Sequence, residues 1–377
     1  MNILCLKKDH QFEVVLKEIK TMNSFFGAGR IELEDKIAEI FGTKKAKLRS
    51  ETIFKKIYKQ NPLDNYDFSE LSHEVIAWLK NNYDFSVPLE ISDIQMSTHD
   101  GSVKFAMRLK SDGKLVESVL IPERGRLTQC ISTQVGCAQG CRFCQTGRMG
   151  LMRSLTTEEI IGQVILAEKW RKENLDFHVS SYQRITNIVY MGMGEPLDNI
   201  DNVIKSTQIF CDHLGLNLSP NKVTVSTVGL MPALDRILNE TKVAVALSLH
   251  SPFEDERSKV MPVNLRHPLT QVIETLRKHT LSGTRHSFMI QYTLLRGIND
   301  TERHAEALVS LLQGVGAKIN LIPLNEHEGA SFRRPDLGRV YQFQQILKNS
   351  GMVATVRLSK GRDIQAACGQ LIKDKVK

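Results

Sequence analysis

The stretch QVGCAQGCRFCQTGRMG, residues 134–150, brings three cysteines together with the spacing C-x3-C-x2-C. Cys137, Cys141 and Cys144 offer thiolates, which are ligands for soft metal centres. A tetrahedral metal site or an iron–sulfur cluster usually takes four protein ligands. No fourth ligand is close in the sequence, so the stretch predicts a metal centre with one position left open.

Strand-like and helix-like segments alternate from Thr128 to the C-terminus. We expect strands at 128–132, 185–191, 222–227, 243–249, 287–294, 317–323 and 352–358. We expect helices at 157–171, 200–214, 231–239, 269–280, 301–313 and 337–349, the first with a capping box of Thr156 and Glu159. This alternation predicts an α/β fold with a parallel sheet, namely a full or partial (β/α) barrel. Chemistry in barrels lies at the C-terminal ends of strands, and the cysteines follow the first strand.

Two further regions precede the barrel. Residues 1–90 carry helical apolar stripes and are expected to form an accessory domain, bounded by Pro88. Residues 91–125 contain alternating apolar residues on both sides of the turn at 111–113, which predicts a β-hairpin extension. Glu117 lies on an otherwise apolar strand face, where a carboxylate is either exposed or held for a purpose. Residues 126–377 would then be the barrel with its C-terminal segment.

The composition predicts a cytoplasmic protein, and its basic charge suits an anionic partner, nucleic acid first, or an ordinary basic enzyme equally well. The 377 residues carry a formal charge of +8, 41% hydrophobic residues and no apolar run of membrane-spanning length. We expect no signal peptide, no membrane association and no disulfide framework, with Cys5 and Cys211 as inert thiols. The basic run of Lys44, Lys45, Lys47, Arg49, Lys55, Lys56 and Lys59 is either a solvated helix surface or a patch that contacts phosphates of such an anionic partner, and further candidates on later loops are Arg257, Lys259, Arg333 and Arg334.

The residues alone leave two kinds of metal centre open. One is a structural zinc site with a distant fourth ligand such as His250. The other is a cubane cluster in which one iron lacks a protein ligand and binds the amino group and carboxylate of S-adenosylmethionine (SAM). A zinc ribbon would need a second close cysteine pair, which the sequence lacks.

Several motifs carry a family resemblance. They are CISTQVGC at 130–137, YMGMGEPLDN at 190–199, VTVSTVGLMPAL at 223–234, ALSLHSP at 246–252, RSKVMPVN at 257–264, INLIPLN at 319–325 and GRDIQAACGQL at 361–371. The cysteine triad, with Phe143 before its last member, resembles the radical-SAM signature. Together the motifs resemble the RlmN/Cfr family of RNA adenine methyltransferases, roughly from residue 100 to 371.

This resemblance implies a mechanism and its residues. A [4Fe–4S] cluster on Cys137, Cys141 and Cys144 would cleave SAM to an adenosyl radical. Cys368 would accept a methyl group from a first SAM, and the radical from a second SAM would abstract hydrogen from that methyl group. The resulting carbon radical would add to the adenine. Cys130 would then attack the sulfur of Cys368, form a transient disulfide and release the product, with Glu117 as the proton acceptor.

The resemblance also implies the SAM site, the partners and the alternatives. SAM contacts would come from Gly194, Glu195, Ser226, Ser248, Leu249, His250 and Asn325, with Gly192 and Gly194 allowing close backbone approach. The substrate would be C2 of an adenine in 23S rRNA and possibly tRNA, with flavodoxin or ferredoxin as electron donor and the enzyme a monomer. A C8-adenine methyltransferase and a non-catalytic RNA-binding protein with a structural metal stay open as alternatives.

Overall fold

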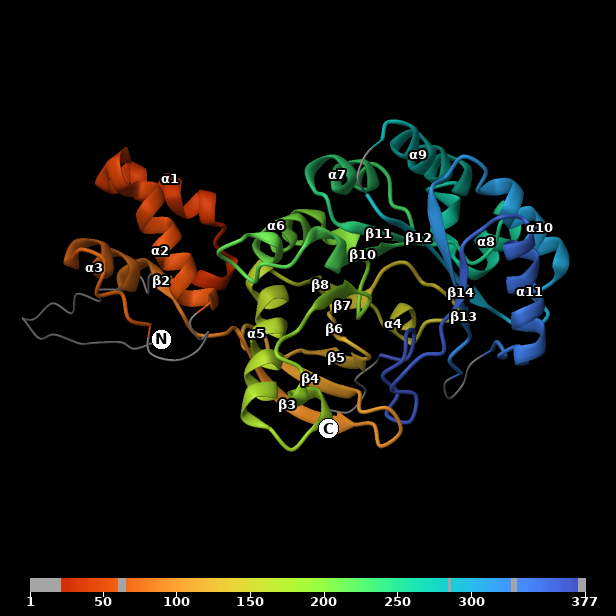
Figure 1. Cartoon of the computed structure of the whole chain (residues 1–377), viewed down its shortest axis with the longest axis horizontal. Coiled ribbons are helices and arrows are strands. Elements are labelled where there is room, and N and C mark those ends of the chain that lie inside the picture. The colour runs from red at the N-terminus through yellow and green to blue at the C-terminus, as the bar shows by residue number, and fades with distance from the viewer. Residues whose placement is uncertain (1–21, 60–65, 284–285, 327–330, 372–377) are drawn as a thin grey trace, which may run out of the picture.

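A single large sheet organises the chain in the computed structural model, which describes residues 22–59, 66–283, 286–326 and 331–371. Its ten strands follow the order β14-β13-β12-β11-β10-β9-β6-β5-β4-β3 (Figure 1). Their bounds are β3 Leu89–Met96, β4 Val103–Leu109, β5 Leu115–Glu123, β6 Arg126–Cys130, β9 Asn187–Tyr190, β10 Val223–Thr227, β11 Ala244–Ser248, β12 Phe288–Leu294, β13 Ala317–Pro323 and β14 Ala354–Val356. The strands from β6 through β9 to β14 pair in parallel, while β3, β4 and β5 continue the sheet antiparallel. Because the order has two ends, the barrel is partial, as expected.

Helices connect the parallel strands and cover the outside of the barrel (Figure 1). They are α5 Thr157–Glu173, α6 Ile200–Cys211, α7 Ala233–Glu240, α8 Glu254–Val260, α9 Leu269–Leu281, α10 Glu302–Leu311 and α11 Leu337–Asn349. The predicted capping box of α5 is confirmed, since Thr156 and Glu159 each bond the backbone N–H of the other. Short 3-10 turns lie at Phe25–Gly27, Thr43–Lys45, His178–Ser181, Pro196–Asn199, Pro220–Lys222 and Pro262–Leu265.

The N-terminal helices form a separate lobe beside α5 and α6 (Figure 1). They are α1 Arg30–Phe41, α2 Ala46–Lys59 and α3 His73–Asn82, and the short strands β1 Asn23–Ser24 and β2 Tyr83–Asp84 pair in parallel. An aromatic cluster fills this lobe, with the ring of Phe25 5.3 Å from Phe85 and 5.6 Å from Tyr83. Arg30 bonds Asp212 at the end of α6 at 2.9 Å, which attaches the lobe to the barrel.

The cysteine stretch forms its own small unit between β6 and α5. β7 Gln134–Cys137 pairs antiparallel with β8 Gly150–Ser154, and the one-turn helix α4 Gln145–Arg148 lies between them. No helix among the described residues is both long enough and apolar enough to cross a bilayer.

Candidate active site

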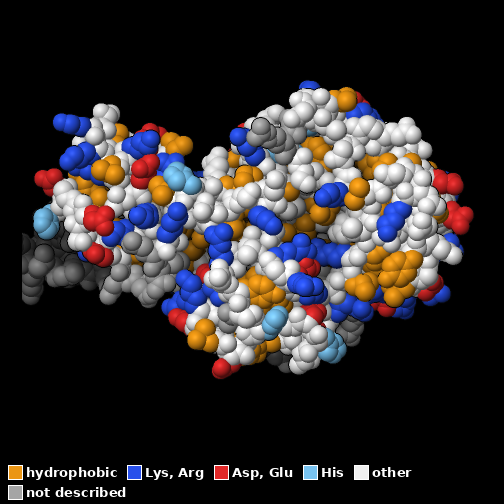
Figure 2. Space-filling view, in the orientation of Figure 1, with side chains coloured by type: hydrophobic (Ala, Val, Ile, Leu, Met, Phe, Trp, Pro, Cys, Tyr) orange, Lys and Arg blue, Asp and Glu red, His pale blue; other side chains and the backbone are white. Residues whose placement is uncertain are grey.

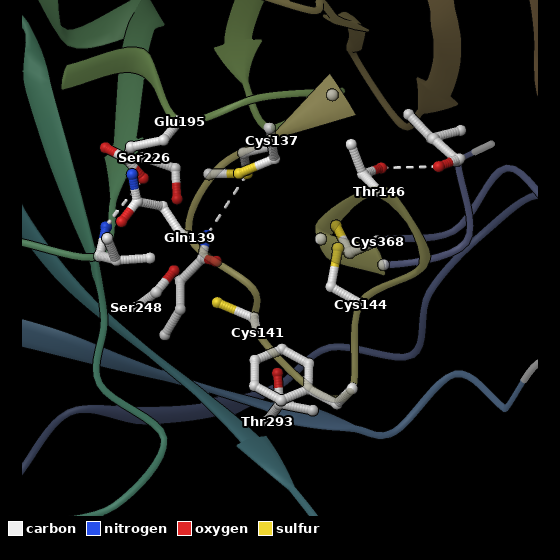
Figure 3. A pocket seen from close by; sticks show the side chains of 18 of the residues that line it. Cys137, Gln139, Cys141, Cys144, Thr146, Glu195, Ser226, Ser248, Thr293 and Cys368 are labelled. Atoms are coloured by element: carbon white, nitrogen blue, oxygen red, sulfur yellow. Dashed lines mark hydrogen bonds between the residues drawn. The ribbon is translucent and has the colours of Figure 1, made fainter. Parts of the chain in front are cut away.

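One pocket at the C-terminal ends of the barrel strands gathers most of the predicted site residues (Figure 3). Its lining includes Cys137, Cys141, Cys144, Gly194, Glu195, Ser226, Ser248, His250, Asn325 and Cys368. Leu249 is not among the lining residues, because its side chain is fully buried and its N–H donates to the Gln291 carbonyl at 3.0 Å. Glu117 and Cys130 lie outside this pocket, on the neighbouring strands β5 and β6.

The three cysteines of the triad surround one space, and Cys368 lies beside Cys144 (Figure 3). Burial raises the pKa of the Cys137 thiol to about 12, and it also raises the pKa values of Cys141 and Cys144. Thiols of this kind stay protonated until a positive centre binds them as thiolates. The donor set therefore fits a metal cofactor.

The triad can hold a cubane cluster, because each of its thiolates can bind a different iron atom. Among the described residues, no group of three or more His, Cys, Asp or Glu side chains is placed to hold one metal ion. His250 is also a poor zinc ligand, since its Nδ1 accepts a 2.8 Å hydrogen bond from the Thr293 N–H. Burial lowers the pKa of His250 to about 3, so the ring is neutral and packs edge-on against Phe143.

Glu195 presents a buried carboxyl group to the pocket. Its Oε1 accepts from the Leu197 N–H and its Oε2 from the Val228 N–H, each at 3.1 Å. Burial raises the pKa of Glu195 to about 7, although these hydrogen bonds oppose the shift. A carboxyl group with this pKa is partly ionised at neutral pH and can accept N–H donors from a ligand amino group.

We expect SAM binding to strengthen as the pH rises through the pKa of Glu195. N–H donors prefer the carboxylate to the neutral acid, so the affinity should rise by up to about tenfold per pH unit below pH 7 and then level off. Equilibrium dialysis of SAM with the anaerobic holoenzyme measures this dependence. The Glu195→Gln variant should bind SAM more weakly and lose this pH dependence. A wild-type affinity that does not change with pH would contradict a contact between Glu195 and the SAM amino group.

Asn325 links the pocket to the C-terminal segment. Its Nδ2 donates to the Cys368 carbonyl at 3.1 Å and to Ser359 Oγ at 2.9 Å. Its Oδ1 is buried and has no hydrogen-bond partner within the described part of the chain. A buried acceptor without a partner is costly, and a bound polar ligand would relieve that cost. Asn325 therefore fits the predicted SAM contact and also holds the backbone of Cys368.

The glycines of the GMGE motif serve the protein's own packing. A Cβ on Gly192 would lie 2.7 Å from the Ile131 carbonyl, and one on Gly194 would lie 2.6 Å from Gln134 Cβ. Gly194 also has a φ of +102°, which side chains rarely allow. The close backbone approach predicted from the sequence is therefore made by the segment after β6, while both glycines line the pocket.

The Gly194→Ala substitution should consequently destabilise the protein. The added methyl group meets Gln134, and the φ of +102° adds strain of about 1–3 kcal/mol. Thermal unfolding should show a lower Tm than wild type. The Gly29→Ala variant is the control, because a Cβ there meets no atom within 4 Å, and an equal Tm loss in both variants would contradict the argument.

Cys130 and Cys368 share a second, smaller cavity. It is also lined by Ile121, Val189, Met191, Arg357, Ser359, Lys360, Ala366, Ala367 and Leu371. Cys130 is buried. Its burial raises the pKa of its thiol, the neighbouring Cys368 raises this pKa further, and Arg357 opposes the shift. Both cysteines are free thiols in the structure. Residues that are distant in sequence thus bring these two sulfurs to one cavity beside the triad pocket.

Glu117 is buried on the same face of the sheet as Cys130. Val119 pairs with Cys130 across β5 and β6, and side chains two residues apart on a strand share a face. Ser132 Oγ donates to the Glu117 carbonyl at 2.6 Å, which joins this strand to the start of the cysteine loop. The carboxylate is therefore held inside the protein rather than exposed.

Arg257 and Thr146 have structural roles that the sequence pattern does not indicate. Arg257 is 0% exposed, so its prediction as a phosphate contact is wrong. Its guanidinium donates to the carbonyls of Val228, Ser248 and Leu249, which it holds at the strand ends. The C-terminal segment is tied to the cysteine loop by Thr146, whose Oγ1 donates to the Leu371 carbonyl at 2.6 Å. No local pattern marks such long-range contacts.

The chain is similar to known proteins over most of its length. Residues 131–308 match the Radical SAM superfamily. The chain is 42% identical over 330 residues to the dual-specificity RNA methyltransferase RlmN of Desulfosudis oleivorans, covering 87% of this chain and 86% of that protein. It is 38% identical over 371 residues to the RlmN of Campylobacter lari, covering 94% and 98%.

A solved structure extends the likeness to three dimensions. The crystal structure of a radical SAM methyltransferase from Sphaerobacter thermophilus superposes with a TM-score of 0.82 at 37% identity, covering 93% of this chain and 99% of that one. With identity at this level over nearly the whole length, the chain belongs to the RlmN family of radical SAM RNA methyltransferases.

Proposed function

We propose that this protein methylates C2 of an adenine in RNA through an S-methylated Cys368. The observation that carries the proposal is the placement of Cys368. It lines both the triad pocket and the cavity of Cys130, so one sulfur faces a methyl donor site and a resolving thiol. The backbone around it is fixed to the cysteine loop by the 2.9 Å hydrogen bond from the Gln145 N–H to the Gly369 carbonyl.

The radical SAM cofactors supply chemistry that side chains lack. Cys137, Cys141 and Cys144 would hold a [4Fe–4S] cluster, and Glu195, Ser226, Ser248, His250 and Asn325 would surround SAM. When bound, the cluster delivers the electron that cleaves SAM. Such a route suits C2 of adenine, an electron-poor carbon that does not attack a sulfonium methyl group as an amine would.

The chain's own residues perform the remaining steps. The Cys368 thiolate displaces the SAM methyl group, so that a carbon–sulfur bond forms and S-adenosylhomocysteine leaves. After the methyl carbon has joined the adenine, the radical adduct loses one electron, which the oxidised cluster would accept, and Glu117 accepts the ring proton. The Cys130 thiolate then attacks the sulfur of Cys368, so that a disulfide forms. The electron pair of the carbon–sulfur bond passes to carbon, which takes up a proton and becomes the methyl group. A cellular thiol reductant restores both cysteines, which fits a cytoplasmic enzyme.

Exposed basic side chains support RNA as the substrate. Lys44, Lys45, Lys47, Lys55 and Lys59 are exposed on the N-terminal lobe, where Figure 2 shows a gathering of basic groups. Lys259 and Arg333 are exposed on the barrel, whereas Lys56 pairs with Glu70 at 2.7 Å. We infer that residues 1–90 contact RNA and that residues 126–377 carry the chemistry, with 91–125 between them. The dual specificity named for the relatives favours 23S rRNA together with tRNA as targets.

Mass spectrometry and nucleoside analysis test the proposal together. Protein purified anaerobically should carry a methyl group on Cys368, and RNA treated with SAM and a flavodoxin or ferredoxin donor should contain 2-methyladenosine. Finding 8-methyladenosine would support the alternative C8 reaction instead. An unmethylated Cys368 in protein with an intact cluster would overturn the proposed route. Gel filtration of the same sample tests the expected monomer.

A further inference from the structure

A buried lysine connects the proposed base to the segment that carries Cys368. Lys104 in β4 is 7% exposed and Glu117 is 3% exposed. The Lys104 Nζ lies 3.3 Å from Glu117 Oε1 and 3.4 Å from the Gln365 carbonyl oxygen. One ammonium group thus contacts both the carboxylate and the backbone three residues before Cys368.

The strand register places the lysine on the catalytic face of the sheet. Lys104 and Cys130 each pair with Val119, from β4 and β6 respectively. Side chains paired across strands share a face, so Lys104, Glu117 and Cys130 all point to the side on which the C-terminal segment lies. The strand register decides this placement, because a shift of β4 by one residue would turn the Lys104 ammonium group to the other face of the sheet.

Stability alone gives a weak reason for this buried ion pair. Removing an ammonium and a carboxylate from water costs several kcal/mol per ion, and their attraction often only offsets that cost. An apolar pair would suit the same space, since Ala106 and Val119 on this face of the sheet are apolar and buried. A buried carboxylate that must stay ionised does require a neighbouring cation.

The contacted backbone is itself unusual. Gln365 has a φ of +51°, a left-handed conformation that residues other than glycine rarely adopt. A second contact holds the same segment, because the Gly361 N–H donates to Asp100 Oδ2 at 2.7 Å. Asp100 therefore holds the segment alone, whereas Lys104 contacts both the segment and Glu117.

We propose that Lys104 is a positioning residue that keeps Glu117 ionised and aligned with the Cys368 segment for removal of the adenine proton. The inference rests on the proposed roles of Glu117 and Cys368. Lys104 acts through Glu117, so its loss should slow resolution of the RNA adduct and leave methylation of Cys368 itself unchanged.

A double-mutant cycle with the reconstituted holoenzyme tests this role. The Lys104→Met variant should keep wild-type S-methylation of Cys368, lose about 10²- to 10⁴-fold in methyladenosine formation and accumulate RNA covalently bound to protein. In a Glu117→Gln background the same substitution should add little further loss. The Lys104→Arg variant, which keeps the charge, should recover much of the rate.

The Asp100→Ala variant is the matched control for loosening of the segment. It should reduce the rate modestly without adduct accumulation, because Glu117 keeps its cation. The inference would be overturned if the Lys104→Met and Asp100→Ala variants lost the same rate and accumulated the same amount of adduct. It would also be overturned if the rate losses of Lys104→Met and Glu117→Gln multiplied in the double variant. If Lys104→Met does not fold, Lys104→Gln takes its place in the cycle. Failure of the wild type to methylate Cys368 or RNA would instead refute the proposed function.

Discussion

Replacing Cys130 with alanine is expected to leave RNA covalently attached to Cys368. Both residues line one small cavity, which supports the proposed attack of the Cys130 thiolate on the Cys368 sulfur. Without that attack the carbon–sulfur bond to the transferred carbon cannot break, so each chain should react once and stop. Turnover should fall by roughly 10⁴- to 10⁶-fold, as it does when an enzyme loses a nucleophile.

A denaturing gel and mass spectrometry measure the trapped species. The variant should show a band of protein joined to RNA that nuclease treatment reduces to a Cys368 peptide carrying one nucleotide. The Cys211→Ala variant is the control, because Cys211 is a half-buried free thiol at the end of α6. Normal turnover by the Cys130→Ala variant would show that another group resolves the adduct.

The barrel could be predicted from the sequence because its elements are long and regular. The expected strand at 317–323 and helix at 337–349 coincide with β13 and α11. The strands β7 and β8 and the helices α4 and α8 were missed, because they are short and lack a full hydrophobic period. α8, with the sequence EDERSKV, resembles a solvated loop although its Arg257 is buried.

Local sequence patterns indicate only some of the residues of the candidate site. The motifs and the alternation of strands and helices indicated the triad and the strand-end residues, and the structure brings most of them into one pocket. The contacts of Lys104 and Arg257 could not be foreseen, because charged side chains are usually exposed and their burial depends on residues far along the chain. The residues that Gly192 and Gly194 contact likewise lie about sixty positions earlier in the chain, so only the tertiary fold brings them together.

Replacing Cys368 with alanine should abolish RNA methylation altogether. The substitution removes the proposed methyl acceptor but keeps the backbone carbonyl that accepts from Asn325 at 3.1 Å. The cluster ligands are untouched, so iron content should stay near wild type, whereas the release of 5′-deoxyadenosine should fall because its hydrogen donor, the S-methyl group, is missing. The rate of methyladenosine formation should fall by more than about 10⁴-fold, and no covalent adduct between RNA and protein should form. Methyladenosine formed at a comparable rate would mean that the methyl group does not pass through this sulfur.

The double variant Cys130→Ala/Cys368→Ala tests whether the trapped RNA is bound to the Cys368 sulfur. If Cys368 accepts the methyl group before Cys130 acts, the double variant should match Cys368→Ala and form no adduct. The trapped species of the single Cys130→Ala variant would then require the Cys368 sulfur. An adduct in the double variant would instead place the bond to RNA on a side chain other than these two cysteines, although both line the cavity beside the triad pocket, and would overturn both assignments.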